Sequence, residues 1–309
     1  MATQPAAVAE ADQPDDRRGS ASPAETPIAI SVTELLGIAL HPVDAGCSYL
    51  FGGLDVTADA LHPVARLLAD DAMRLRCGSS PALSKWRARR DGLAPREDDL
   101  DRREIEVFVA PAFGLRTSPD LGKTRHHVQG FVAELLWNRL ILDRTETPDG
   151  RRLTHTQEVK GDPTGTGGDG FVVYEVADGT LVFRLWEIKK HLAKEPISAK
   201  IKEAADQLAE HGARYLAMLT GPGSAHSGAL GKLYGDLVRL WLERSPRAGI
   251  GISITTSAEH APAKHPAFQS IAKVFPDFPN EGQREAAMIV LPDFASFSEA
   301  VREAVWSGL

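Results

Sequence analysis

Two carboxylates and an ammonium group stand at the ends of two strand-like runs in the middle of the chain. Asp169 precedes the apolar run 170–176, and Glu187 and Lys189 end the run 180–189. Carboxylate oxygens are the ligands that hard divalent cations prefer. An ammonium beside such a cation can orient an attacking water and stabilise negative charge that develops on a phosphate. These residue types therefore indicate metal-dependent cleavage of a phosphodiester bond.

The second run ends in charges that share a face with apolar residues. Alternate residues of a strand point to the same face, so Glu187 and Lys189 continue the apolar face that begins at Leu181. A helix is expected to cover this face, and buried charges without a partner are costly. A Glu-x-Lys at a strand end is more often a solvated rim, so the site depends on what lies across from Glu187.

The turn between the two runs decides whether Asp169 can reach Glu187. A two-residue loop at 178–179 would place Asp169 on the opposite face of the hairpin. A three-residue loop at 177–179 would place it directly across from Glu187. The three-residue loop is a common hairpin connection that ends on a residue in the left-handed region, which Gly179 adopts at little cost. The sequence therefore predicts that the two carboxylates face each other.

The elements around this hairpin predict an α/β fold. Apolar residues at helical spacing predict a helix over 126–142 before the hairpin and another over 197–219 after it. The later part of the chain predicts helices over 229–244 and 296–306 and strands over 248–256 and 286–291. We expect a mixed β-sheet flanked by helices.

The first third of the chain has no pattern that indicates chemistry. Residues 1–27 are rich in Ala, Pro, Asp, Glu and Ser and are predicted to form a disordered tail. Residues 28–115 are predicted to form an accessory α/β region that could bind a partner, with a helix over 56–76 and a strand over 103–112. The rest of the chain, 116–309, is predicted to form the domain that contains the hairpin.

Composition limits the class of protein. The 309 residues carry a formal net charge of -7, which gives no global attraction to nucleic acid but allows a local basic strip. No apolar run is long enough to cross a membrane, and the first residues lack the pattern of a signal peptide. Cys47 and Cys77 are too few for a disulfide framework or a cysteine zinc site. We expect a cytoplasmic protein.

The order helix, hairpin, helix, with these charges on the hairpin, resembles the core of the PD-(D/E)xK nuclease superfamily. Asp169, Glu187 and Lys189 match the metal-binding and catalytic positions of its motif. Glu134, inside the preceding helix, matches a glutamate that many members place beside the metal. Gln207, on the following helix, resembles a glutamine that several members carry.

This resemblance covers about 122–220 and implies a restriction-endonuclease-like core. It implies a Mg²⁺ ion, or Mn²⁺ in its place, held by Asp169, Glu187, Glu134 and the backbone carbonyl of Ile188. Lys189 would then position the attacking water, and Gln207 would support the site. Tyr215 is a weaker match, and Gly168 stands where a proline often precedes the aspartate.

A narrower resemblance concerns "GGDGF" and "LWEIKKH" behind a helix with an internal glutamate. This arrangement is similar to the nuclease subunit of Hachiman-type bacterial antiphage systems, whose members work with a helicase and cut DNA. The resemblance implies a DNA substrate, a helicase partner and a role in antiphage defence.

Basic residues follow the hairpin and run into the next helix: Lys190, His191, Lys194, Lys200 and Lys202. They are candidates for contact with a phosphate backbone, and such contacts would make binding depend on salt. The other interpretation is a solvated start of a helix.

Two other functions remain open on the sequence. The chain could be a catalytically silent subunit that keeps the nuclease fold and binds nucleic acid or a protein partner. It could also be a metal-dependent hydrolase of a small phosphate ester. The sequence does not separate DNA from RNA as substrate, nor single from double strands.

Overall fold

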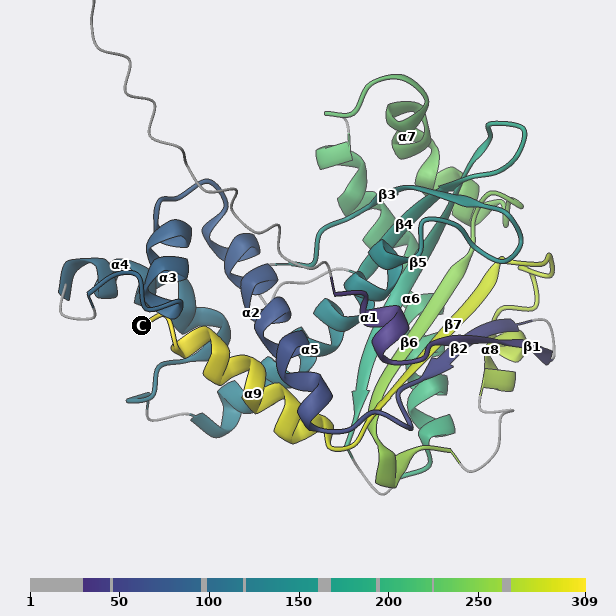
Figure 1. Cartoon of the computed structure of the whole chain (residues 1–309). Helices are drawn as coiled ribbons and strands as arrows, with labels where there is room; N and C mark the ends of the chain where they lie inside the picture. Colours follow the sequence, from purple (N-terminus) through teal and green to yellow (C-terminus); the bar gives the residue numbers. More distant parts are fainter. Residues whose placement is uncertain are drawn as a thin grey trace, which may run out of the picture.

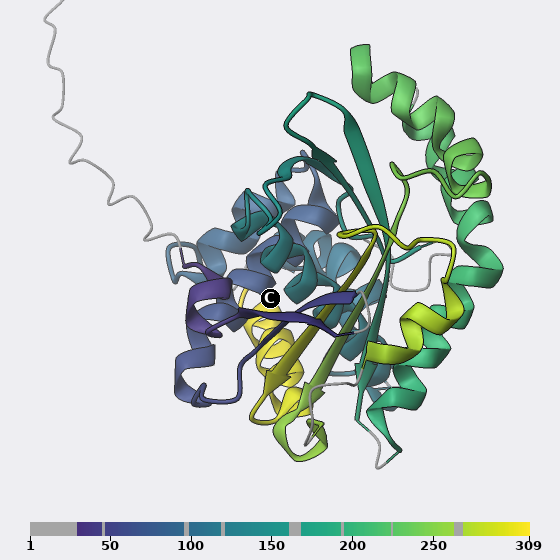
Figure 2. The same ribbon diagram turned by 90° about the vertical axis from the view of Figure 1, so that its right-hand side faces the viewer.

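Seven strands form one mixed β-sheet between two layers of helices (Figures 1 and 2). The computed structural model describes residues 30–44, 47–95, 99–118, 121–160, 168–192, 195–223, 225–262 and 268–309. The predicted α/β class, with a mixed sheet flanked by helices, is confirmed. The tail predicted over 1–27 lies outside the described residues.

The sheet has a parallel centre and antiparallel edges, in the order β1-β2-β7-β6-β5-β4-β3. Its strands are β1 (Ala39–Asp44), β2 (Cys47–Gly52), β3 (Arg152–Thr156), β4 (Gly170–Glu175), β5 (Leu181–His191), β6 (Ile250–Ser257) and β7 (Arg284–Leu291). Neighbours from β2 through β7 and β6 to β5 run parallel, whereas β1, β4 and β3 pair antiparallel. Every residue of β6 and β7 is buried, as expected of parallel strands covered on both faces.

One face of the sheet is covered by the helices on the left of Figure 1. They are α1 (Val32–Leu35), α2 (His62–Cys77), α3 (Ala82–Arg90), α4 (Asp99–Phe113), α5 (Leu121–Asp143) and α9 (Phe294–Trp306). The core on this side includes Val172, Trp186 and Ile188 from β4 and β5. Short 3₁₀ turns lie at Asp59–Leu61 and Ala258–His260.

The opposite face is covered by α6 (Ile197–Gly223), α7 (Gly228–Leu242) and α8 (Gln269–Val274), as Figure 2 shows edge-on. Its core contains Phe183 and Leu185 from β5, packed with Ile201 and Leu208 from α6. The predicted apolar face of β5 is therefore covered by a helix, and Glu187 continues this face toward α6.

The predicted strand over 103–112 is wrong, because this segment lies inside α4. The apolar residues at 105, 107 and 109 alternate as in a strand, but Val107 is 69% exposed. The buried residues are Ile105, Val109, Ala112 and Phe113, at the spacing of one face of a helix. Burial against α3 and α5, rather than the alternation, sets the structure here.

The first third of the chain belongs to the same sheet and the same helical layer. β2 pairs in parallel with β7, near the end of the sequence. The indole N–H of Trp86, in α3, donates to the carbonyl of Val305 in α9 at 2.8 Å. Neither β1, β2 nor the edge strand β3 was predicted from the sequence. Residues 32–113 thus help to complete the layers around the hairpin.

Candidate active site

β4 and β5 pair in the register that the three-residue loop requires. Gly170 lies across from Trp186, and the same register sets Asp169 across from Glu187. In the turn, Gly179 has a φ of 81°, in the left-handed region that glycine adopts readily. The prediction that the two carboxylates face each other is confirmed.

Asp169 is held at the start of β4 by the next strand. Its Oδ2 accepts a hydrogen bond from the backbone N–H of Ile188 at 3.0 Å. The N–H and C=O of one residue in an extended strand point to the same side, so the Ile188 carbonyl also faces Asp169. A β-carbon at Gly170 would lie 2.3 Å from the ring of Trp137 on α5. Only glycine therefore fits at this position, next to Asp169, without displacing the ring.

Glu187 is a fully buried carboxylate, and only one of its two oxygens has a hydrogen-bond partner among the described residues. The residue is 0% exposed, and its Oε1 accepts a hydrogen bond from Lys189 at 2.6 Å. Its Oε2 is buried and has no hydrogen-bond partner among the described residues. Burial and the neighbouring Asp169 carboxylate raise the pKa of Glu187 to about 8, although Lys189 opposes them. A cation at Oε2 would offset both unfavourable effects.

Lys189 is the first member of a hydrogen-bonded chain that leads into α6. Its ammonium also donates to Gln207 Oε1 at 2.9 Å, and Gln207 Nε2 donates to the Tyr215 hydroxyl at 3.2 Å. Burial alone would lower the pKa of Lys189. The charge of Glu187 and the hydrogen bond to it outweigh burial and raise this pKa, so Lys189 stays a cation. Gln207 therefore fixes the ammonium beside Glu187.

Glu134 approaches the same carboxylates from α5. Burial, and next the charge of Asp169, raise the pKa of Glu134 well above its ordinary value, with a smaller contribution from Glu187. The structure thus brings together the five predicted catalytic residues. Glu187, Lys189 and Gln207 form one hydrogen-bonded chain, Asp169 lies across from Glu187, and Glu134 interacts through its charge.

The donor set fits a hard divalent cation. Among the described residues, no group of three or more His, Cys, Asp and Glu side chains is arranged to hold a metal ion as it stands. However, the oxygen atoms that Asp169, Glu187 and the Ile188 backbone offer at the hairpin are carboxylate and carbonyl oxygens, which Mg²⁺ and Mn²⁺ prefer to nitrogen or sulfur. The unpartnered Oε2 is the position where such an ion would complete the local charge balance.

Two of the predicted nucleic-acid contacts, Lys190 and His191, lie at the end of β5 and bond to other parts of the chain. The Lys190 ammonium donates to the backbone carbonyl of His126 and to Gln129 Oε1. Burial lowers the pKa of Lys190 to about 8. His191 is 3% exposed, and its Nε2 lies 2.8 Å from the carbonyl of Glu195. Both side chains therefore hold intramolecular partners.

The other predicted contacts lie on the first turns of α6. Lys200 pairs with Glu203 at 2.6 Å, and Lys202 pairs with Asp206 at 2.5 Å. Lys194 lies outside the described residues. A contact between these basic residues and a phosphate backbone stays a prediction.

One charged residue near the site was not predicted. Lys160 follows β3, and its charge lowers the pKa of Glu134. The sequence signal was weak: Leu153, His155, Gln157 and Val159 alternate, but this segment was interpreted as a polar connection.

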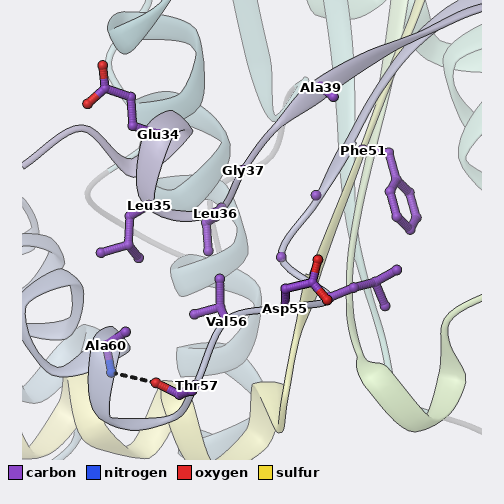
Figure 3. A pocket seen from close by; sticks show the side chains of 13 residues that line it. Glu34, Leu35, Leu36, Gly37, Ala39, Phe51, Asp55, Val56, Thr57 and Ala60 are labelled. Atoms are coloured by element: carbon purple, nitrogen blue, oxygen red, sulfur yellow. Dashed lines mark hydrogen bonds between the residues drawn. The ribbon is translucent and has the colours of Figure 1, made fainter.

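The described residues also line hollows outside the carboxylate cluster. A cavity of about 410 Å³ is lined by α1, by β2 and by the residues that follow β2 (Figure 3). Glu34 and Asp55 are the titratable residues among those that line it, and their side chains point apart. An open groove of about 610 Å³ runs along α6 beside Gln207 and Tyr215. Of these two, only the groove along α6 is lined by residues of the site, Gln207 and Tyr215.

No family model, curated protein or solved structure matches this chain. No helix among the residues that the structure describes is long and apolar enough to cross a membrane. The function therefore has to be argued from the chemistry of the hairpin.

Proposed function

We propose that the protein is a Mg²⁺-dependent nuclease with a restriction-endonuclease-like core of the PD-(D/E)xK type. One observation carries the proposal: Glu187 is fully buried across from Asp169, with Oε2 unpartnered and Lys189 bonded to Oε1. A buried carboxylate without a full set of partners costs stability, and such costs concentrate at functional sites.

One group of residues would bind the metal, and another would orient the attacking water. Asp169, Glu187 and the Ile188 carbonyl would hold the cation, with Glu134 on the α5 side. The ion would supply positive charge to the scissile phosphate and to the water that attacks it. Lys189 would orient that water, and the hydrogen bond from Lys189 to Gln207 would hold the ammonium in place.

The substrate and partner follow from the resemblance rather than from the site. DNA is the favoured substrate, in antiphage defence, with a helicase subunit as partner and a cytoplasmic location. A helicase gene beside the gene for this chain would support this assignment.

Incubation of the purified protein with labelled DNA and RNA tests the activity. We expect cleavage with Mg²⁺ or Mn²⁺ and none in EDTA. We expect Lys189→Met to lower the rate at least about 100-fold, the usual order for loss of a group that moves or orients a proton. Lys232→Met is a matched control, because Lys232 is an exposed lysine on α7, distant in sequence from the hairpin.

The same experiment separates the alternatives. A silent binding subunit would bind nucleic acid and leave it intact with every metal, alone and with the helicase. A hydrolase of small phosphate esters would cleave a chromogenic phosphodiester but not a polynucleotide. Either result would contradict the proposal.

A further inference from the structure

Lys160 lies beside the carboxylates on the outer side of the hairpin. Thr156 pairs with Val172 in β3 and β4, and the backbone N–H of Gln157 donates to the Phe171 carbonyl at 2.9 Å. The chain therefore continues along β4 after β3 ends. The same register carried forward places Lys160 across from Gly168, the residue before Asp169.

The residue before Lys160 anchors this segment. Val159 is 3% exposed and belongs to the core beneath α5, the helix that carries Glu134. The Lys160 charge acts on Glu134 more strongly than the Lys189 charge does, which agrees with an ammonium close to Glu134. Lys160 and Lys189 thus stand on different sides of the carboxylates.

Lys160 also differs from the other lysines near the site. Lys189, Lys190, Lys200 and Lys202 each donate to a carboxylate, an amide or a backbone carbonyl. Lys160 is half-buried, and its ammonium makes no hydrogen bond or ion pair with another described residue. Its charge is available to an anion from outside.

The opposite side of the site is unsuited to a polyanion. The groove along α6 is lined by three carboxylates, those of Glu203, Asp206 and Glu210, against the cation of Lys202 and the imidazole of His211. Glu203 and Asp206 already pair with Lys200 and Lys202, and Glu210 adds a further carboxylate, so this lining does not favour a phosphate backbone. At the β3 edge the carboxylates of Glu158 and Glu175 are paired with Arg74 and Arg152, so Lys160 adds a positive charge there.

We propose that Lys160 binds a backbone phosphate of the substrate, and that the strand enters over the β3 edge of the hairpin and not along α6. This inference rests on the proposed nuclease function. It names Lys160 as a substrate-binding residue for a polynucleotide, distinct from Lys189, which acts on the water.

Kinetics of the full chain on a labelled polynucleotide test this contact, with Lys160→Met, Lys160→Arg and the matched control Lys232→Met, an exposed lysine on α7. We expect Lys160→Met to raise KM about tenfold with a much smaller change in kcat, because a lost phosphate contact weakens binding of substrate and transition state alike. The slope of log KM against log salt concentration should decrease by about 0.7–0.9, the change expected when one phosphate contact is lost. Lys160→Arg should restore most of the affinity, and Lys232→Met should match the wild type.

Calorimetric titration with Mn²⁺ keeps the two proposals distinguishable. Lys160→Met should bind Mn²⁺ at least as tightly as the wild type, because it removes a positive charge near Glu134. If the wild type cleaves and Lys160→Met has the wild-type KM and salt slope, Lys160 does not bind a phosphate, but the proposed nuclease activity is retained. If Lys202→Met raises KM more than Lys160→Met does, the proposed entry of the substrate over the β3 edge is wrong. If the wild type neither binds nor cleaves any polynucleotide, both proposals fail.

Discussion

At the scale of single residues, the site depends on a glutamate that the fold keeps away from water. Glu187 has one oxygen bonded to Lys189 and the other without a partner among the described residues. Its pKa is raised from 4.5 to about 8, so near neutral pH the empty site favours the protonated acid. Binding of a divalent cation requires the carboxylate, so the cation and the proton compete for the same group.

This competition predicts the pH dependence of stability. The folded pKa of Glu187 lies above the unfolded value, so its contribution to stability is complete below about pH 4.5 and is lost as the pH rises through about 8. Without metal, we expect the Tm to fall across this window. With saturating Mg²⁺ the fall should be smaller or reversed, because the ion binds the ionised form.

Glu187→Gln is the variant that checks this assignment. The amide keeps an acceptor for Lys189 and cannot ionise, so the fall in Tm between pH 5 and 8 should shrink. It should not vanish, because Glu134 is shifted in the same direction. A Tm profile with the wild-type slope would show that Glu187 is not the titrating group.

At the scale of elements, the hairpin is fixed by two glycines with different tasks. Gly179 supplies the left-handed residue of the turn, and Gly170 lets the start of β4 approach Trp137. The turn sets which face Asp169 occupies, and the close approach sets how near it lies to α5. Both conditions are needed to bring Asp169 near Glu187 and near Glu134.

Gly170→Ala should therefore disturb the site through packing alone. Its β-carbon would lie 2.3 Å from the Trp137 ring, and overpacking of this kind costs about 1–3 kcal/mol. We expect a lower Tm and a weaker affinity for Mn²⁺. Gly130→Ala on α5, the helix that carries Trp137, is the control: a β-carbon there has no atom within 4 Å, and helix propensity predicts a gain of about 0.5–1 kcal/mol. Equal Tm changes in the two variants would contradict this account.

The hairpin could be predicted from sequence because local rules agree there. Alternation, a turn with glycine in the required position and a change to helical spacing all favour one register. From this register followed the positions of Asp169 and Glu187. Gln207, to which Lys189 donates a hydrogen bond, was named by the resemblance and not by a local rule.

The β3 edge could not be predicted because its pattern is interrupted. The register shifts between Leu153 and His155, and every residue of β3 is at least partly exposed. The alternation of this segment is weak and no residue of β3 is buried, so it was not interpreted as a strand, and Lys160 was missed with it. The position of Lys190 was foreseeable, since it falls on the other face of β5 from Glu187 and Lys189.

At the scale of the whole molecule, the first third is packed into the layers around the site. β2 extends the sheet through β7, and α2 and α3 share a core with α5 and α9. Trp86 is 0% exposed, and its indole N–H bonds to the carbonyl of Val305. Residues 28–115 and 116–309 therefore share buried surface rather than meeting through a linker.

Shared burial predicts joint unfolding. Differential scanning calorimetry of the full chain should show one cooperative transition, because separation of the two parts would expose the common core. A fragment over 116–309 should lose cooperative unfolding or aggregate, since it lacks the partners of α9 and β7. Two resolved transitions, with the fragment reproducing one of them, would instead show independent domains.

The most direct test of the central claim is calorimetric titration of the wild type, Asp169→Asn and Glu187→Gln with Mn²⁺ near neutral pH in buffers of different ionisation enthalpy. If Asp169 and Glu187 share one cation, the wild type should bind a single ion per chain and release protons, and both variants should lose most of the affinity. Binding of the same strength and proton release in Glu187→Gln would contradict the claim.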